Sequence, residues 1–308
     1  MAVKPRGRPI NGWLVLDKAR GITSAEAVTR VRHLLDAAKA GHGGTLDPLA
    51  TGVLPIALGE ATKTVSYVMD GRKSYRFILK WGEERSTDDS EGVVTETSPR
   101  RPRRVEIEAV LPRFQGEIEQ VPPAFSAVRV SGRRAYDLAR KQEDFQLVPR
   151  RVMVERLALL SRDGSDEATF EVVCGKGAYM RALARDLGRA LDTRAHIVVL
   201  RRTAVGPFDE GAAISLESLE ALGHSAAALE QVLPVETALD DIPALALTDT
   251  EANRLRCGQA VSLLARYRRE RVSQLSDGAI VCATAGGKPV ALTRYQAGEI
   301  HPVRVLNL

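Results

Sequence analysis

Cysteine and histidine are scarce in this chain of 308 residues. The three cysteines, Cys174, Cys257 and Cys282, are an odd number with wide spacing, which argues against a disulfide framework and a cysteine-rich zinc site. The five histidines show no metal-binding spacing such as His-Glu-x-x-His. The sequence therefore implies no metal, and its cysteine usage fits a reducing compartment.

Long hydrophobic runs are absent as well. No stretch approaches the roughly 20 apolar residues that span a bilayer, and the basic N-terminus lacks the apolar core of a signal peptide. The sequence contains neither a P-loop nor a Gly-x-Gly-x-x-Gly motif that follows a strand, so a nucleotide cofactor is not expected. We expect a soluble, cytoplasmic protein without membrane association.

Aromatic residues make up only 5% of the chain, whereas apolar residues make up 44% and charged residues 27%. This is the usual mixture of a globular protein with enough material for a core, so disorder as the main state is excluded. At roughly 100–200 residues per domain, the length suggests two domains, or one large domain and a small one.

Charge is unevenly distributed along the chain. The segment 209–251 carries ten acidic residues and no lysine or arginine, and the other 265 residues carry 44 basic and 29 acidic groups. A strongly basic body beside an acidic block favours a polyanionic partner. A solubilising surface would explain the charge alone equally well.

Hydrophobic periodicity predicts an α+β protein with a small β-rich module at its C-terminal end. Thr23 and Glu26 form a capping box for a helix that is expected to run to about Lys39. The other expected helices cover 105–114 and 178–191, the latter with Arg181, Arg185 and Arg189 on one side. Strands are expected at 12–17, 75–81, 92–97, 152–160, 168–174 and 197–205, and the β-rich module at 244–308.

The segment 41–59 is glycine-rich, apolar and poor in charge, which indicates a buried, tightly turned loop. Asp47 lies in its middle, so its carboxylate is expected to be partly desolvated, and the glycines let a ligand approach the backbone. An Asp-Pro turn without function is the ordinary alternative for Asp47 alone. His42, in the same loop, has no evident base partner and could fill a gap in a base stack.

Tyrosines interleaved with basic residues form the second pattern. Tyr75, Tyr136 and Tyr179 each lie among arginines and lysines, an arrangement with which proteins hold splayed-out RNA bases. Each tyrosine alone could equally anchor its element to the core. Together with the basic body, the pattern favours contacts to RNA phosphates, and we expect such contacts from Lys18, Lys63, Arg129, Arg133, Arg134 and Arg202.

The stretch GHGGTLDPLATGVLPIALGEATK, residues 41–63, resembles the signature of the bacterial tRNA pseudouridine-55 synthases, the TruB family. The segments GWLVLDKARGITS, KSYRFILKWGEERSTDDSEG, VPPAFSAVRVSGRRAYDLAR and GKGAYMRALARDLG agree with the family in the same order. Residues 10–210 carry the resemblance, and the tail from 244 resembles the family's small RNA-binding domain of PUA type. Ala19 stands where the family usually has proline, a departure that removes no catalytic group.

The resemblance implies a pseudouridine synthase fold, a mostly antiparallel mixed sheet flanked by helices, followed by a PUA-like domain. It divides the chain into a catalytic domain at 1–243, with an RNA-gripping insertion at 115–150 and an acidic linker region at 209–243, and an RNA-binding domain at 244–308. The implied activity is isomerisation of uridine 55 in the tRNA T-loop by base flipping and by cleavage and re-formation of the glycosidic bond, without metal, cofactor or obligatory protein partner.

The resemblance also implies roles for individual residues. Asp47 would be the catalytic aspartate, Arg181 its ion-pair partner, and Tyr75 the ring that stacks on the target base. His42 would occupy space near the flipped nucleotide, and Tyr179 and Leu200 would line the uracil pocket. Two alternatives remain open: a non-catalytic tRNA-binding and folding chaperone of the same fold, and the catalytic subunit of a guide-RNA-dependent synthase.

Overall fold

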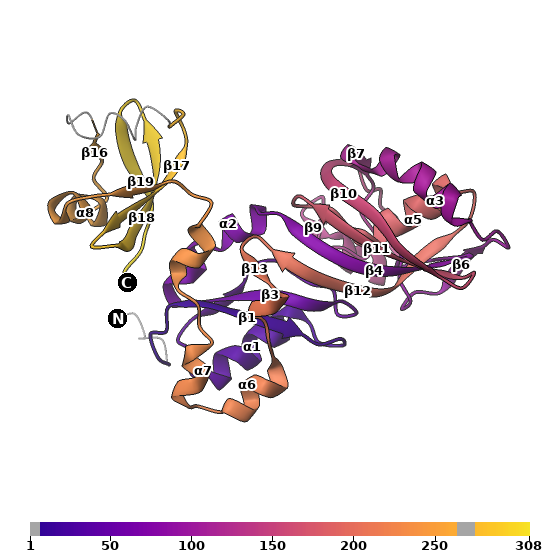
Figure 1. Cartoon of the computed structure of the whole chain (residues 1–308), viewed down its shortest axis with the longest axis horizontal. Helices are drawn as coiled ribbons and strands as arrows, with labels where there is room; N and C mark the ends of the chain where they lie inside the picture. The colour runs from indigo at the N-terminus through magenta and orange to yellow at the C-terminus, as the bar shows by residue number, and fades with distance from the viewer. Residues whose placement is uncertain (1–6, 264–274) are drawn as a thin grey trace.

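The computed structural model describes residues 7–263 and 275–308, so part of the basic N-terminus and an internal stretch of the C-terminal module lie outside the described residues. The described chain forms two sheets, one of ten strands and one of five, and two short two-stranded ribbons. In Figure 1 the five-stranded sheet lies at one end of an elongated molecule and α5 lies towards the other. None of the described helices is long and apolar enough to cross a membrane.

The large sheet is mixed but mostly antiparallel, as expected: only the pairs β14–β1 and β3–β12 are parallel among its described strands. In spatial order its strands are β14 (Ile214–Ser215), β1 (Gly12–Lys18), β3 (Thr51–Leu58), β12 (Ala195–Val205), β4 (Lys73–Trp81), β11 (Glu167–Cys174), β10 (Arg150–Asp163) and β7 (Gly116–Gln120), with β2 (Ala40–His42) beside β3 and β13 (Phe208–Asp209) beside β12.

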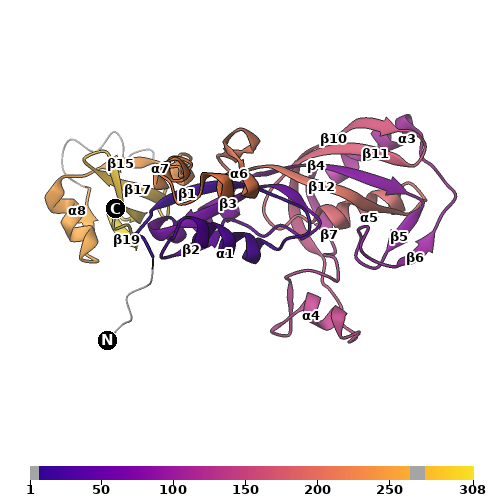
Figure 2. The same cartoon turned by 90° about the horizontal axis from the view of Figure 1, so that it is seen from below.

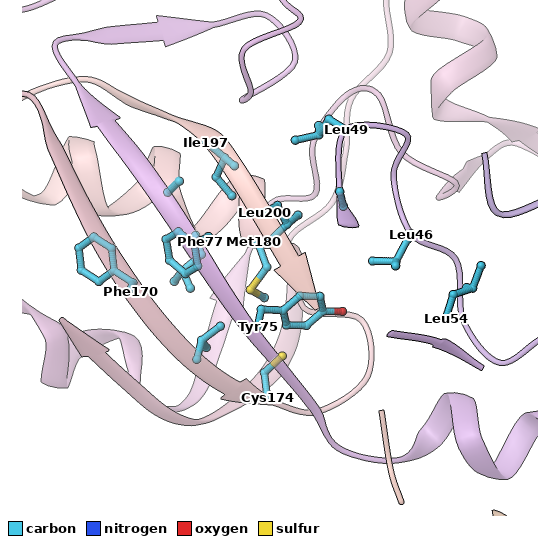
Figure 3. Packing of buried hydrophobic residues seen from close by; sticks show 14 of the residues in the cluster. Leu46, Leu49, Leu54, Tyr75, Phe77, Phe170, Cys174, Met180, Ile197 and Leu200 are labelled. Atoms are coloured by element: carbon cyan, nitrogen blue, oxygen red, sulfur yellow. The ribbon is translucent and has the colours of Figure 1, made fainter. Parts of the chain in front are cut away.

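The core of this sheet follows from strands with alternating burial. In β4 every second residue from Lys73 to Trp81 is buried, because successive side chains of a strand point to opposite faces. Phe77 stacks on Phe170 of β11 with ring centroids 5.3 Å apart, and Trp81 meets the same ring edge-on. Figure 3 shows the rings of Phe77 and Phe170, with Tyr75 further along β4. The packed sheet thus forms a rigid base beneath Tyr75.

Helices flank the sheet. The expected capping box is half present at α1, where the Thr23 side chain accepts a hydrogen bond from the Glu26 backbone. This helix ends at Leu34, before the expected Lys39, because Asp36 adopts a left-handed φ of 51°. The helices are α1 (Ser24–Leu34), α2 (Val65–Asp70), α3 (Arg104–Val110), α4 (Ala135–Arg140), α5 (Met180–Ala190), α6 (Leu216–Leu222), α7 (Ala226–Glu230) and α8 (Asp249–Arg256), and the 3-10 turns are η1 (Gly59–Lys63), η2 (Leu111–Phe114), η3 (Glu210–Ala212) and η4 (Val235–Leu239).

The protruding segment is shorter than the 115–150 that the sequence suggested. Residues 116–120 form β7, which pairs with the start of β10 at the edge of the large sheet. The part between these strands, residues 121–149, carries the ribbon of β8 (Arg129–Val130) and β9 (Arg133–Arg134) and the helix α4. We call residues 121–149 the insertion, and Figure 2 shows its helix α4 standing away from the sheet. A second ribbon joins β5 (Glu83–Arg85) to β6 (Val94–Thr97).

The acidic segment 209–243 is more than a connection between sheets. It supplies β14 to the large sheet, and Leu233 exchanges backbone hydrogen bonds with Trp13 of β1. The second sheet begins directly after it, in the order β15 (Ala244–Ala246), β17 (Ile280–Ala285), β18 (Lys288–Gln296), β19 (Glu299–Val305) and β16 (Val261–Ser262). The acidic residues thus belong to a segment that is tied into the body of the protein.

Candidate active site

The loop that carries Asp47 connects β2 to β3 and is held by hydrogen bonds to its backbone, some of them from α1. The Ser24 hydroxyl donates to the Leu46 carbonyl at 3.0 Å and accepts from the Leu46 amide at 2.8 Å. The Asp47 carbonyl accepts from the Ala50 amide, which closes a turn. Gly52 has a φ of +99°, and a Cβ there would lie 2.2 Å from the Arg202 carbonyl, so only glycine lets β3 approach β12 this closely. The expected glycine-rich loop at 41–59 is confirmed only for residues 43–50, because Thr51–Leu58 forms the strand β3 in the large sheet and His42 ends β2.

Two buried cations support this loop from beneath. Lys18 donates to the carbonyls of Ala19, Ile22 and Pro48, and burial lowers its pKa to about 8, so it remains charged at neutral pH. Arg202 donates to the carbonyls of Val53, Thr45 and Gly44. Lys18 and Arg202 were expected to bind RNA phosphates, but they are 0% and 1% exposed and donate to the protein backbone, so the structure gives that role no support.

Asp47 and Arg181 form the expected ion pair. Nε and Nη2 of Arg181 lie 2.9 Å and 2.8 Å from Oδ2 of Asp47, and the guanidinium is buried whereas the carboxylate is 36% exposed. Both contacts use one oxygen, so Oδ1 has no hydrogen-bond partner among the described residues. The arginine therefore fixes the carboxylate's orientation, while one oxygen remains available to a ligand.

Arg181 begins a row of ion pairs along α5, formed by the three arginines that the sequence spacing places on one side of the helix. Arg185 contacts Asp88 at 2.9 Å and Arg189 contacts Glu84 at 2.9 Å. Arg181 itself lies 3.7 Å from Asp89, whose side chain is 3% exposed. Two further donors of Arg181 reach the backbone carbonyls of Thr87 and Phe125. The guanidinium that contacts Asp47 is thus held from several sides.

A cavity of about 540 Å³ opens beside this ion pair. Its lining includes Asp47, Tyr75, Tyr179, Arg181 and Leu200, which come from the loop after β2, from β4, from the start of α5 and from β12. Figure 3 shows Leu200 beside the Tyr75 ring and the Tyr75 hydroxyl directed towards the side on which Leu46 lies. The fold therefore brings these five site residues, separated by up to 153 positions, to one concave surface.

Burial alters the acidity of both cavity tyrosines. Tyr75 is 8% exposed, and desolvation raises its pKa, opposed by the nearby charge of Arg202. Burial likewise raises the pKa of Tyr179. Both phenols are therefore neutral near pH 7, and each offers an aromatic face and a hydroxyl proton to a ligand.

His42 does not line the cavity. It is the last residue of β2 and pairs with Ile56 of β3, and its Nδ1 is buried without a hydrogen-bond partner among the described residues. Burial and the charge of Arg202 lower its pKa, so its ring is neutral. Its proposed role beside a flipped nucleotide remains a prediction.

The other expected RNA contacts lie on two different parts of the molecule. Arg129, Arg133 and Arg134 are exposed on the insertion, where with Arg140 they surround a shallow cavity of about 690 Å³. Lys63 instead donates to Glu60 and to the Val305 carbonyl of the second sheet. Arg129 and Arg134 are thus accessible to a polyanion, whereas Arg133 already donates to both carboxylate oxygens of Glu143 and Lys63 holds two protein acceptors.

Sequence reasoning did not single out three buried residues near Arg181. Asp88, Asp89 and Gln120 are 6%, 2% and 3% exposed. Burial raises the pKa of Asp88 to about 6, opposed by Arg185 and Arg181. Consecutive acidic residues in a polar loop resemble a solvated turn in a sequence, so only the arginine row on α5 could have indicated buried partners for them.

Comparison with known proteins places this geometry in context. Residues 32–180 match the model of the TruB family pseudouridylate synthase N-terminal domain, and residues 181–240 match that of the tRNA pseudouridylate synthase B C-terminal domain. The tRNA pseudouridine synthase B of Rhodospirillum rubrum is 56% identical over 100% of both chains, and that of Caulobacter vibrioides is 51% identical over 100% of both.

Solved structures share the fold. A chain in the crystal structure of the archaeal box H/ACA sRNP Nop10–Cbf5 complex superposes with a TM-score of 0.73 at 25% identity, covering 96% of this chain and 86% of that one. A chain of a Cbf5–Nop10–Gar1 complex gives 0.72 at 26% identity, covering 96% of this chain and 84% of that one. The fold and the site define a pseudouridine synthase, an isomerase with a mixed catalytic sheet and a C-terminal β domain. The chain belongs to the TruB family.

Proposed function

We propose that this protein isomerises uridine 55 in the T-loop of tRNA to pseudouridine, with Asp47 as the catalytic carboxylate. It acts in the cytoplasm on tRNA, without a guide RNA and without an obligatory protein partner. The observation that carries the proposal is the Asp47–Arg181 ion pair, which lies in a cavity that also contains two neutral tyrosines.

The reaction has three parts, and the site offers a group for each. The N1–C1′ bond breaks, the uracil turns, and a C5–C1′ bond forms while a proton leaves C5 and N1 gains one. The carboxylate attacks C1′, stabilises its developing positive charge, or adds to C6 of the base. All three routes require an ionised carboxylate, held here by its contact with Arg181, and a site from which the bound RNA excludes water.

The aromatic lining suits a base that has left its stack. Tyr75 can hold the uracil against its ring while the base turns, and its hydroxyl can exchange a proton. Leu200 and Tyr179 complete the apolar surface around it. Extruding the base costs on the order of a few kcal/mol, and phosphate contacts from the exposed insertion arginines would offset that cost.

The decisive test is Asp47→Asn, assayed on an unmodified tRNA transcript by mass-shift mapping of pseudouridine. We expect conversion to fall below detection, because the amide carries no charge for the reaction, while tRNA affinity stays within about threefold. Near-normal turnover by this variant would contradict the proposal. Absence of activity of the wild-type chain on the bare transcript would favour the guide-RNA-dependent alternative.

A tRNA-folding activity is a second candidate, favoured by the exposed arginines of the insertion, which form a basic cavity apart from the Asp47 cavity. Such an activity would persist in Asp47→Asn. Refolding of a tRNA transcript in the presence of the variant therefore separates it from catalysis.

A further inference from the structure

Gln120 is a buried amide with a defined pair of partners. It is the last residue of β7, is 3% exposed, and uses both ends of its side chain on one residue. Its Nε2 donates to the Tyr179 carbonyl at 3.0 Å, and its Oε1 accepts from the Tyr179 amide at 2.7 Å. Because Tyr179 is 59 positions away in the sequence, these bonds connect the strand before the insertion to the start of α5.

Tyr179 is the residue from which α5 begins. Its carbonyl also accepts the first helical bond, from the Leu183 amide, and no side chain of its own turn caps the helix. The position of the Tyr179 backbone therefore sets the position of Arg181, two residues later in the first turn. Gln120 thus determines where the guanidinium meets Asp47, although it touches neither group in the described contacts.

Two arginines of α5 hold the residues that follow Gln120. Arg185 donates to the Val121 carbonyl at 2.8 Å, and Arg181 donates to the Phe125 carbonyl at 2.9 Å. Between these points stand Pro122 and Pro123, whose rings restrict the backbone. The base of the insertion is therefore tied to the catalytic helix at three points, and one of them uses the same guanidinium that contacts Asp47.

We propose that Gln120 is a positioning residue for the isomerisation: it fixes Tyr179 and Arg181 against Asp47 and connects the insertion to the active site. RNA bound to the exposed arginines of the insertion is thereby connected to the active site, because the base of the insertion contacts the guanidinium that pairs with Asp47. Displacements on the order of 1 Å at such positions lower rates by about 100-fold. The inference rests on the proposed function, because its readout is pseudouridine formation in tRNA.

The test is Gln120→Met, which keeps the length of the side chain and removes both hydrogen bonds. We expect the single-turnover rate on tRNA to fall on the order of 10–100-fold, while the dissociation constant for tRNA stays within about threefold and the protein remains folded by circular dichroism. Gln120→Glu keeps the acceptor for the Tyr179 amide and loses the donor when ionised, so its rate should be intermediate and should recover towards low pH, where the protonated carboxyl again donates.

The matched control is Gln115→Met, the same change at an exposed position just before β7. Its rate and affinity should equal those of the wild type. A wild-type rate in Gln120→Met would overturn the assignment, and so would a loss explained fully by weaker tRNA binding or by partial unfolding. If the wild type and Gln115→Met also fail to modify tRNA, the proposed function itself is wrong, which distinguishes the two failures.

Discussion

At the level of single residues, basic side chains that look alike in the sequence differ in their burial and in their hydrogen-bond partners. Lys18 and Arg202 hold backbone carbonyls beneath the Asp47 loop, whereas Arg133 and Arg134 are exposed on the insertion. Composition counts all four as possible phosphate contacts, because it does not reveal which donors the protein itself uses. Asp47 and Tyr75 stand out in the sequence because a carboxylate in an apolar loop and an aromatic ring among cations are locally unusual, but only the family resemblance indicates roles for them.

A substitution at Tyr75 can separate two proposed contributions of this side chain, stacking of its ring on the uracil and proton exchange by its hydroxyl. Tyr75→Phe keeps the ring that faces the cavity and removes only the hydroxyl. We expect tRNA affinity within about threefold of the wild type and a loss in single-turnover rate on the order of 10²–10⁴, the usual size of a general acid–base contribution. Because burial raises the pKa of the Tyr75 phenol above its ordinary value, the phenol stays protonated in the neutral range, so the wild-type rate should show no loss from its ionisation there.

The matched change is Tyr295→Phe, on β18 of the second sheet and outside the cavity lining. It should leave the rate unchanged. Equal rates for Tyr75→Phe and the wild type would mean that the Tyr75 hydroxyl takes no part in proton exchange and that the ring acts only by stacking.

At the level of elements, the sequence predicted α1, α3, α5 and the longer strands β1, β4, β10, β11 and β12 because their periodicity is local, but it missed β3 and several short helices. It did not predict where the elements meet. Pairing of β14 with β1, about 200 positions apart, and the contact of Asp88 and Asp89 with α5 depend on the folded chain. The insertion's boundary was placed too early for the same reason, since β7 becomes a strand only by pairing with β10.

The contact between α5 and the loop after β5 predicts that the free energy of unfolding depends on pH. Burial raises the pKa of Asp88 from about 3.8 to about 6 in the folded state. Between these pH values the folded protein binds more protons than the unfolded chain, so protonation of Asp88 stabilises the fold. This contribution to the free energy of unfolding is complete below about pH 4 and is lost as the pH rises through 6. Asp88→Asn is neutral at every pH and keeps an oxygen for Arg185, so it lacks this loss.

The measurement is the free energy of unfolding in urea at pH 4.5 and 7.5. The wild type should lose stability relative to Asp88→Asn by about 1–3 kcal/mol between the two pH values. Asp192→Asn, at a carboxylate that is 86% exposed just after α5, is the control and should follow the wild type. A difference between the wild type and Asp88→Asn that does not change with pH would contradict the assignment.

At the level of the whole molecule, the two sheets share one hydrophobic cluster. Trp13 of β1, Leu239 of η4, Leu292 of β18 and Leu306 belong to it, and all are at most 4% exposed. Polar contacts accompany it: Glu60 accepts from Lys63 and from the Asn307 amide, both at 2.7 Å. The β-rich character of the C-terminal module could be predicted from its short strands, but its attachment could not, because apolar residues in a sequence do not specify their partners.

This shared cluster predicts that the second sheet and the large sheet unfold together. Leu306→Ala removes buried apolar volume where they meet and should destabilise the protein by about 2–5 kcal/mol. We expect the single thermal transition of the wild type to split in two, with new proteolytic cleavage near residues 240–244. Leu308→Ala, the same change at a side chain that is 48% exposed, should retain one transition and the wild-type cleavage pattern. One cooperative transition in Leu306→Ala, with residues 240–244 still protected, would show instead that the remaining cluster and the Glu60 contacts suffice to couple the sheets.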